Sequence, residues 1–313
     1  FELLIGGTLV EVIGFFGEWV AFEKMKNAEG LKQMFVQFSD LLGPDNLLNM
    51  KVGRFEPGTT RGHPDNDRMT MEHIMPWDYR VSKVGSQWRM RDQQAGIELN
   101  GIVSKRFEYA AGIVNGDGTT LDKNKMKDLY GRIGYKLSGM PIDGEEEIPE
   151  TLATTNNWRD DTLMVGVYGY VGDSILPGGK DKAGKDITYE NDFFRVGVDL
   201  RARYQDLEVL AGAILGQDDN PDNTDKTVDS LGFFVEADYL FKPWLIGVAR
   251  FGQLSFDDPN EKRNDFFTFT PNITILARPN VRLTLEALIQ VEDVVKENKD
   301  NLRWIKGNVL YVF

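Results

Sequence analysis

Apolar and polar residues alternate along most of the chain with a period of two. In "FFRVGVDLRARY", Phe194 and Val196 fall on one face of the expected strand, and Arg195 and Asp199 fall on the other. "LGFFVEADYLF" and "NVRLTLEALIQVE" repeat this pattern. Such alternation is typical of β-strands that have one apolar and one polar face. The pattern therefore predicts an all-β chain.

The predicted strands number fifteen and span most of the sequence. They cover residues 1–13, 15–25, 32–41, 46–55, 93–104, 105–115, 126–138, 161–172, 193–204, 206–216, 229–241, 243–255, 265–278, 280–292 and 302–313. Most are roughly 10 to 13 residues long, whereas strands of globular proteins average about 5 or 6. A tilted strand needs about 9–11 residues to cross a bilayer. The lengths favour a membrane-spanning sheet, although alternation alone also fits a soluble β-sandwich whose apolar faces share a core.

The links between the strands support the membrane interpretation. From Ile113 onward, short and long links mostly alternate, as the periplasmic turns and outer loops of bacterial outer-membrane barrels do. Two long links stand apart. Residues 56–92 follow the strand that ends at Phe55, and a loop of this length is usually functional or disordered. Residues 139–160 fall on the short-turn side, where we expect a longer periplasmic insertion.

The strand count predicts the topology. Single-chain bacterial barrels have an even number of strands. If the last predicted strand ends on the periplasmic side, fifteen strands place residue 1 on the outer side. We therefore expect residues 1–313 to form a single domain, a 16-stranded antiparallel transmembrane β-barrel whose first strand precedes residue 1.

Composition limits the chemistry that the chain can perform. It has 313 residues, a net charge of −13 and no cysteine, which excludes disulfides, thiolate metal sites and cysteine nucleophiles. No basic stripe is present to neutralise phosphates, so we expect no nucleic-acid partner. The two histidines, His63 and His73, lie outside the predicted strands, and the acidic links lack the spacing of a calcium loop. We predict no enzyme activity, no cofactor and no bound metal.

The end of the chain carries a recognisable motif. In "GNVLYVF", Val309, Tyr311 and Phe313 alternate up to a terminal aromatic residue. This pattern resembles the C-terminal signature of outer-membrane β-barrels, in which the last strand is what the assembly machinery recognises. The signature places the expected barrel in the bacterial outer membrane.

A second resemblance covers residues 47–118. The matching residues are Val52-Gly53-Arg54-Phe55 with Pro57, Met71-Glu72-His73, Gly96-Ile97-Glu98-Leu99 with Gly101, and Tyr109 with Gly112-Ile113-Val114-Asn115-Gly116. In this order they resemble the phosphate-selective porin O/P family. The resemblance implies a 16-stranded trimeric porin in which residues 56–92 fold into the barrel and constrict the pore.

Charged residues on the polar faces and in the long link are the candidate pore residues. They are Lys51, Arg61, Arg68, Arg80, Arg89, Arg91, Arg132, Arg195, Asp199, Arg201, Arg203, Glu236, Asp238, Arg282 and Glu286. Acids and bases balance both in the link and on the predicted wall, so the sequence does not predict an anion filter. Arg195, Arg201 and Arg203 form the one local excess of positive charge. They are either an anion track or the partners of neighbouring acids.

These observations predict a passive channel in the outer membrane of a Gram-negative bacterium. It would let small hydrophilic solutes or ions diffuse through a pore narrowed by residues 56–92. The expected surroundings are lipid and lipopolysaccharide, and the expected assembly is a homotrimer. The alternative is a barrel that serves as a scaffold or sheath for a periplasmic or surface protein, such as an electron-transfer cytochrome.

Overall fold

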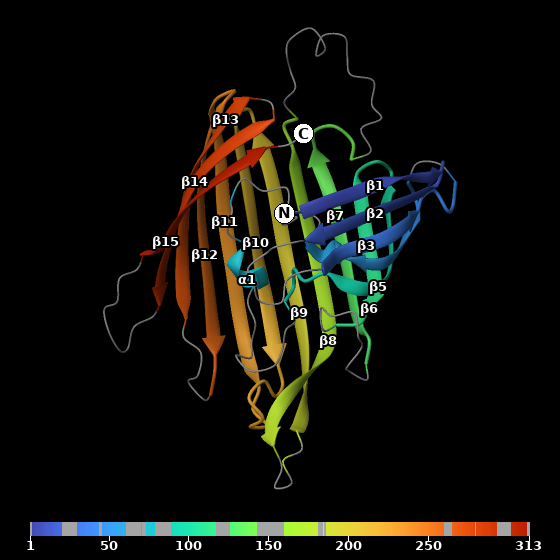
Figure 1. Cartoon of the computed structure of the whole chain (residues 1–313), viewed down its shortest axis with the longest axis vertical. Coiled ribbons are helices and arrows are strands. Elements are labelled where there is room, and N and C mark those ends of the chain that lie inside the picture. Colours follow the sequence, from blue (N-terminus) through green and yellow to red (C-terminus); the bar gives the residue numbers. More distant parts are fainter. Residues whose placement is uncertain are drawn as a thin grey trace.

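The computed structural model describes residues 2–20, 30–43, 46–60, 70, 73–78, 89–116, 126–142, 160–180, 184, 186–259, 265–278, 280–292 and 302–311. Within these residues, fifteen strands form one antiparallel sheet in which each strand pairs with its neighbours in sequence (Figure 1). The predicted number of strands is therefore confirmed. The strand expected before residue 1 stays a prediction.

The elements follow one another in a simple order. The strands are β1 (Glu2–Val10), β2 (Ile13–Val20), β3 (Gly30–Phe38), β4 (Asn49–Phe55), β5 (Gln94–Val103), β6 (Phe107–Val114), β7 (Asp128–Ser138), β8 (Leu163–Lys180), β9 (Asp186–Tyr204), β10 (Leu207–Asp218), β11 (Val228–Lys242), β12 (Leu245–Asp257), β13 (Phe266–Arg278), β14 (Val281–Glu292) and β15 (Leu302–Tyr311). A 3-10 helix, η1 (Gly58–Thr60), and a short α-helix, α1 (Met75–Asp78), lie between β4 and β5. Among the described residues, no helix is both long and apolar enough to cross a membrane.

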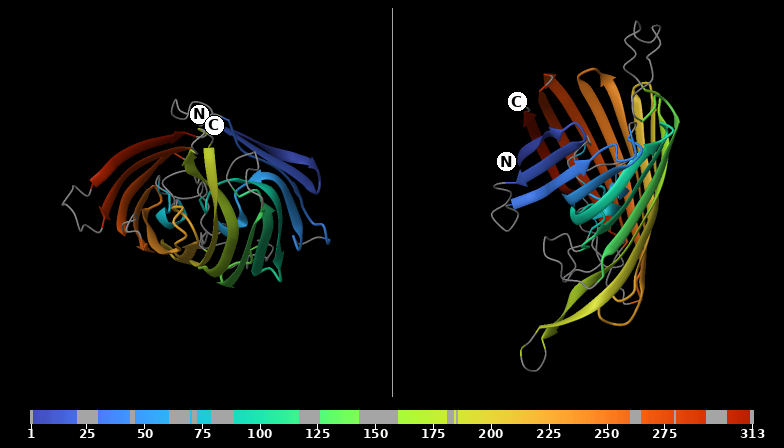
Figure 2. Two further views of the ribbon diagram at one scale, coloured as in Figure 1. Left: turned by 90° about the horizontal axis from the view of Figure 1, so that it is seen from below. Right: turned by 90° about the vertical axis from the view of Figure 1, so that its right-hand side faces the viewer.

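The sheet is curved, and the space on its concave side is called the hollow. Seen from below in Figure 2, the N-terminal and C-terminal strands form the two ends of the curved wall, and β8 and β9 lie in its middle. The chain between β4 and β5 enters the concave side, because η1 contacts β6, β7 and β8, and α1 contacts β11 and β12. The hollow is thus partly occupied by this connection.

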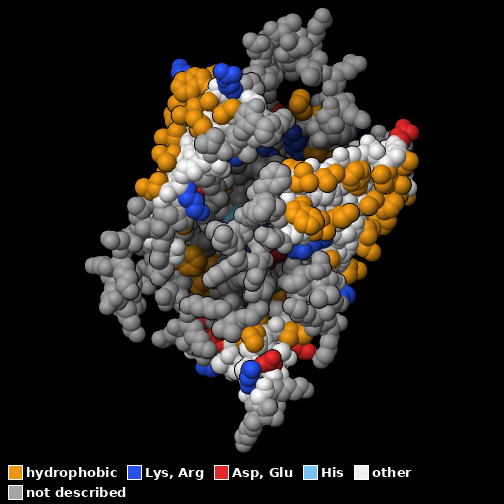
Figure 3. Space-filling view, viewed as in Figure 1, with side chains coloured by type: hydrophobic (Ala, Val, Ile, Leu, Met, Phe, Trp, Pro, Cys, Tyr) orange, Lys and Arg blue, Asp and Glu red, His pale blue; other side chains and the backbone are white. Residues whose placement is uncertain are grey.

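The sheet exposes its apolar face and buries its polar face. On β9, Val196 and Val198 are each 51% exposed, whereas Arg195 and Asp199 are each 6% exposed. Apolar side chains also cover the outside of β1, β2 and β3 (Figure 3). Soluble proteins almost never bury charged residues while leaving an apolar exterior, but a membrane barrel requires this arrangement. The soluble sandwich is therefore wrong, because one curved sheet with an apolar exterior replaces two sheets that share an apolar core.

β8 and β9 continue well beyond their predicted ends. The prediction ended one strand at residue 172 and began the next at residue 193, whereas β8 reaches Lys180 and β9 begins at Asp186. Cross-strand pairing runs on past Asp173 to the end of β8. The sequence shows no alternating signal here because the hairpin projects beyond its neighbours (Figure 1). Away from lipid, backbone hydrogen bonds extend the ladder without an apolar face.

The two ends of the predicted periplasmic insertion are tied together, while residues 143–159 lie outside the described part of the chain. The Asp160 carboxylate accepts hydrogen bonds from Lys136 Nζ at 2.6 Å, Thr162 Oγ1 at 2.7 Å and the Met140 N–H at 2.7 Å. Burial by itself raises the pKa of Asp160, but these three donors outweigh burial and hold the pKa below its ordinary value.

Candidate functional site

The described part of residues 56–92 is tied to the inner face of the sheet. Near its start, the Gly58 N–H donates a hydrogen bond to the Glu98 carboxylate on β5 at 2.7 Å. Further along, Arg250 on β12 donates to the Thr70 hydroxyl at 2.9 Å. These contacts lie on strands that are far apart around the wall, so the segment lies inside the curve of the sheet.

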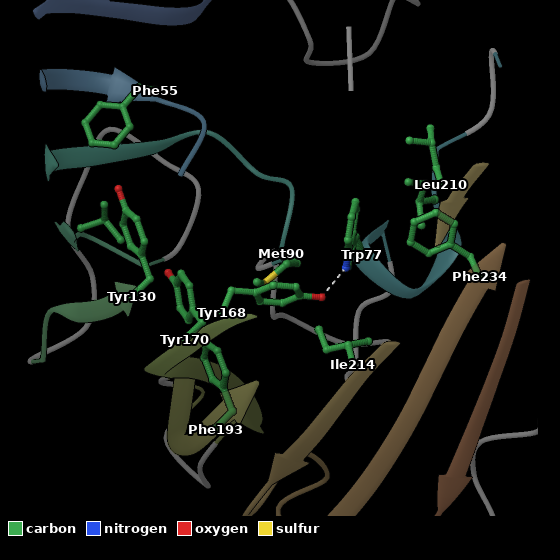
Figure 4. Close-up of a cluster of buried hydrophobic side chains, with 12 residues drawn as sticks. Phe55, Trp77, Met90, Tyr130, Tyr168, Tyr170, Phe193, Leu210, Ile214 and Phe234 are labelled. Atoms are coloured by element: carbon green, nitrogen blue, oxygen red, sulfur yellow. Dashed lines mark hydrogen bonds between the residues drawn. The ribbon is translucent and has the colours of Figure 1, made fainter. Parts of the chain in front are cut away.

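Trp77 of α1 occupies the centre of an apolar cluster inside the sheet (Figure 4). Its indole Nε1 donates a hydrogen bond to the Tyr168 hydroxyl on β8 at 2.9 Å. Its ring meets Phe234 on β11 edge to face, with 5.2 Å between ring centroids. This cluster was not among the predicted contacts, although the sequence carries a signal for it. Tyr168 and Phe234 are large rings on the polar parity of their strands, which indicates a contact with chain inside the wall.

A second group of rings lies further along the inner face (Figure 4). Tyr130, Tyr170 and Phe193 stack in a row, with centroid separations of 6.1 and 5.9 Å. The two tyrosine hydroxyl groups end on buried acids, since Tyr130 donates to Glu98 at 2.7 Å and Tyr170 donates to Asp128 at 2.6 Å. Each buried carboxylate thus receives a hydrogen bond that stabilises its charge.

Several predicted pore residues form ion pairs that are themselves buried. Arg132 on β7 lies between Glu108, at 3.2 Å, and Asp199, with which it forms a bidentate pair. Arg250 pairs with Glu236 at 3.2 Å, and both side chains are almost inaccessible to water. Planar guanidinium groups suit such sites because they bind carboxylates through two parallel hydrogen bonds. These pairs join different strands and stiffen the wall.

The arginine row on β9 also pairs with acids. Arg195 binds Asp218 at 2.8 Å. Arg201 and Arg203 share one carboxylate, that of Glu208 on β10, at 2.5 and 2.7 Å. Of the two predicted roles for this row, pairing with neighbouring acids is therefore what the structure shows.

The remaining predicted residues are distributed along the wall or lie beyond the described residues. Asp238 on β11 stands opposite Glu208 in the cross-strand register. Glu286 on β14 accepts a hydrogen bond from Asn272 at 2.8 Å, and Arg282 is half-buried on the same face of that strand. Nothing is described for Arg61, Arg68 and Arg80.

Lys51 is held in a defined position on the inner face. Its ammonium group lies 5.1 Å from the Phe35 ring centroid and 5.2 Å from that of Phe55. It also contacts the Glu98 carboxylate at 3.3 Å. The two rings attract the cation through their quadrupoles and restrict its side chain. Lys51 is thus an ordered positive charge facing the hollow.

In three groups of ion pairs, the bases reach solvent more than the acids with which they pair. The Lys32 side chain is 28% exposed and its partner Glu18 is 1% exposed, while Lys51 is 15% exposed and Glu98 is 0% exposed. Arg201 and Arg203 are 42% and 38% exposed, and the Glu208 side chain that they share is 18% exposed. The order is reversed at α1, where Asp78 is 30% exposed and its partners Arg89 and Arg91 are less so. It is also reversed between Lys136 and Asp160, at 11% and 17%, and between Arg132 and Glu108, at 1% and 8%. Equal numbers of charges therefore do not present equal charge to water.

The site offers no constellation for metal chemistry within the described residues. No group of three His, Cys, Asp or Glu side chains there is placed to hold a metal ion. His73 is half-buried beside α1, and His63 lies outside the described part of the chain. What the geometry provides is a lined hollow with ordered charges.

The comparisons with known proteins concern structure alone. No protein-family model matches the sequence, and no curated protein matches it. An anion-selective porin from Comamonas acidovorans is 12% identical, over 98% of this chain and 82% of that chain, with a TM-score of 0.63. The outer membrane channel DcaP of Acinetobacter baumannii is 13% identical, over 100% and 84%, with a TM-score of 0.62.

A further solved structure extends the likeness to a protein described as a trimer. The trimer form of OmpT, an outer membrane protein of Vibrio cholerae, is 10% identical over 99% of this chain and 86% of that chain, with a TM-score of 0.57. Identities this low relate the folds and leave the activities open. The curved antiparallel sheet, its apolar exterior and these likenesses together give the chain the β-barrel fold of outer-membrane porins.

Proposed function

We propose that this protein is a passive diffusion channel for small hydrophilic solutes or ions in the outer membrane of a Gram-negative bacterium. The observation that carries the proposal is the inverted burial of the wall, shown by exposed Val196 and Val198 beside buried Arg195 and Asp199. An apolar exterior is stable in lipid, and a charged interior lowers the cost of moving a hydrated solute across it. Residues 56–92 narrow the path from inside.

The channel prefers anions. Lys32, Lys51, Arg201 and Arg203 each reach water more than the acid with which they pair. A passing ion comes closer to a charge that is in contact with water than to the buried charge of its partner. Each of these pairs therefore presents a positive potential to the pore. Asp78 opposes this effect at α1. One structural neighbour is described as an anion-selective porin, which agrees with this preference.

Planar-bilayer recording tests both parts of the proposal. The purified protein is expected to give discrete conductance steps, and a potassium chloride gradient is expected to give a zero-current potential of the sign set by chloride. Absence of any conductance would reject the channel. Conductance with a potential set by potassium would reject the anion preference and leave the channel standing.

Assembly and surroundings follow from the same proposal. The exterior is expected to contact lipid and lipopolysaccharide, and the protein is expected to form a homotrimer that survives detergent without boiling. The neighbour described as a trimer supports this expectation. We also retain the resemblance to the porin O/P family as part of the proposal, with no catalytic role. The alternative of a sheath around a partner protein gains no support, because the wall of the described residues carries its own chain segment.

A further inference from the structure

Gly232 on β11 makes room for α1. If a Cβ atom is built on Gly232, it lies 2.7 Å from the Cβ of Pro76 and 3.1 Å from its Cγ. The backbone of Gly232 is not in the left-handed region, so no turn or strain requires glycine at this position. The need is spatial, because a methyl group would occupy the place of the proline ring. Proline is rigid and cannot swing aside.

Trp77 also anchors α1 to the wall. The indole is 3% exposed, donates to the Tyr168 hydroxyl and meets the Phe234 ring edge to face. Space for Tyr168 itself comes from Gly197, where a Cβ atom would lie 2.3 Å from the Tyr168 ring. Shape, a hydrogen bond and ring contact therefore hold the same four-residue helix against the wall.

We propose that Gly232 is a positioning residue that seats α1 on β11 and thereby sets the cross-section of the channel. The inference rests on the proposed function, since it assumes that the hollow conducts. A buried indole and a close Gly–Pro contact fix α1 in one place, so the helix is a permanent constriction. A methyl group at residue 232 displaces α1 from the wall toward the hollow and narrows the path.

The first test is Gly232→Ala in planar bilayers. We expect a fall in single-channel conductance relative to the unaltered protein. Gly169→Ala is the matched control, because a Cβ atom on Gly169 meets nothing closer than the Arg195 carbonyl oxygen at 3.8 Å. The control is expected to conduct as the unaltered protein does.

A second variant separates seating from general stability. Pro76→Gly removes the two nearest of the three atoms that the added methyl meets and leaves only Ile214 Cγ2, at 3.2 Å. The double variant Gly232→Ala with Pro76→Gly is therefore expected to conduct like Pro76→Gly alone. A residue that served only the stability of the sheet would show no such pair-specific rescue.

Hydrogen exchange over residues 73–78 gives a readout that does not depend on conduction. Gly232→Ala is expected to speed exchange in this segment, and Gly169→Ala is expected to leave it unchanged. If Gly232→Ala changed neither the conductance nor the hydrogen exchange, the positioning role of Gly232 would be overturned. The role would also be overturned if both Gly232→Ala and the double variant failed to fold while the control folded. Residue 232 would then be needed for the folding of the sheet and not for the position of α1. If the unaltered protein gives no conductance, the proposed function is rejected. Hydrogen exchange then still tests whether Gly232 positions α1.

Discussion

Lys51 and Glu98 form a salt bridge in which the lysine alone reaches water, with side chains 15% and 0% exposed. Glu98 also accepts hydrogen bonds from the Gly58 N–H and the Tyr130 hydroxyl, so its charge is satisfied inside the wall. The ammonium of Lys51 is held between two rings. Glu98 thus binds three donors inside the wall, while Lys51 presents its charge to the hollow.

Removing the exposed cation is expected to weaken the preference for anions. Lys51→Met keeps the apolar stem and deletes the charge, so the zero-current potential in a salt gradient should shift toward that of potassium. The double variant Arg201→Gln with Arg203→Gln should shift it further, because these side chains are more exposed. Lys180→Gln makes the same charge change at the end of β8 and serves as the control. Equal zero-current potentials in the unaltered protein and in all three variants would contradict the role of these cations in the anion preference.

Removing the buried acid is expected to destabilise the protein. Glu98→Ala leaves Lys51, the Gly58 N–H and the Tyr130 hydroxyl without their shared acceptor. Loss of one partner of a buried pair lowers the free energy of unfolding by about 3–5 kcal/mol. The measurement is the urea midpoint of the band shift between folded and unfolded protein on unboiled gels. Glu11→Ala, in the exposed turn after β1, should leave the midpoint unchanged; a similar loss in both variants would show that Glu98 has no special place.

A charge on the exterior is expected to impair folding in lipid. Val198 is 51% exposed on the outer face of β9, and Val198→Arg places a guanidinium group against acyl chains. The cost is about 2–4 kcal/mol near the bilayer midplane. Folding equilibria in lipid vesicles measure it. Glu190→Arg, on the projecting part of the same strand, is the control, and equal folding of the two variants would argue against a lipid-facing exterior.

Low pH is expected to weaken the contacts through which Asp160 joins the two ends of residues 139–160. The pKa of Asp160 is lowered in the folded protein, because three hydrogen bonds outweigh the effect of burial. Its contribution to stability is therefore complete above the unfolded pKa of about 3.9 and is lost as the pH falls through the lower, folded pKa. Thermal unfolding between pH 2 and pH 7 should show a steeper acid loss in the unaltered protein than in Asp160→Asn. If the two proteins lost thermal stability with falling pH at the same rate, Asp160 would not be the source of the acid sensitivity.

The sequence was sufficient to predict the strands and their faces. Phe194, Val196, Arg195 and Asp199 alternate because a strand that separates lipid from a polar interior must place every second residue in each medium. This constraint is local and repeats along the chain. The prediction failed where the constraint ends, in the β8–β9 hairpin beyond Asp173, because pairing continues there without an apolar face.

The contacts inside the wall could not be predicted in the same way. Trp77 and Tyr168 are 91 residues apart, and their meeting depends on the path that the chain takes across the hollow. Gly232 carried no signal either, because the purpose of a glycine in a strand becomes clear only once the neighbour that fills the space, Pro76, is known. Large rings at inward positions were the available hint.

By itself, the sequence determined the membrane-type sheet, its inward charges and their near balance, because alternation and composition are local properties of the chain. Tertiary structure alone decided which charges meet water. Lys51 and Glu98 count equally in the sequence, but Glu98 lies beneath Gly58 and Tyr130 while Lys51 faces the hollow. Exposure depends on distant segments that cover one partner and leave the other open, so equal numbers of acids and bases in the sequence do not determine which of them meets water.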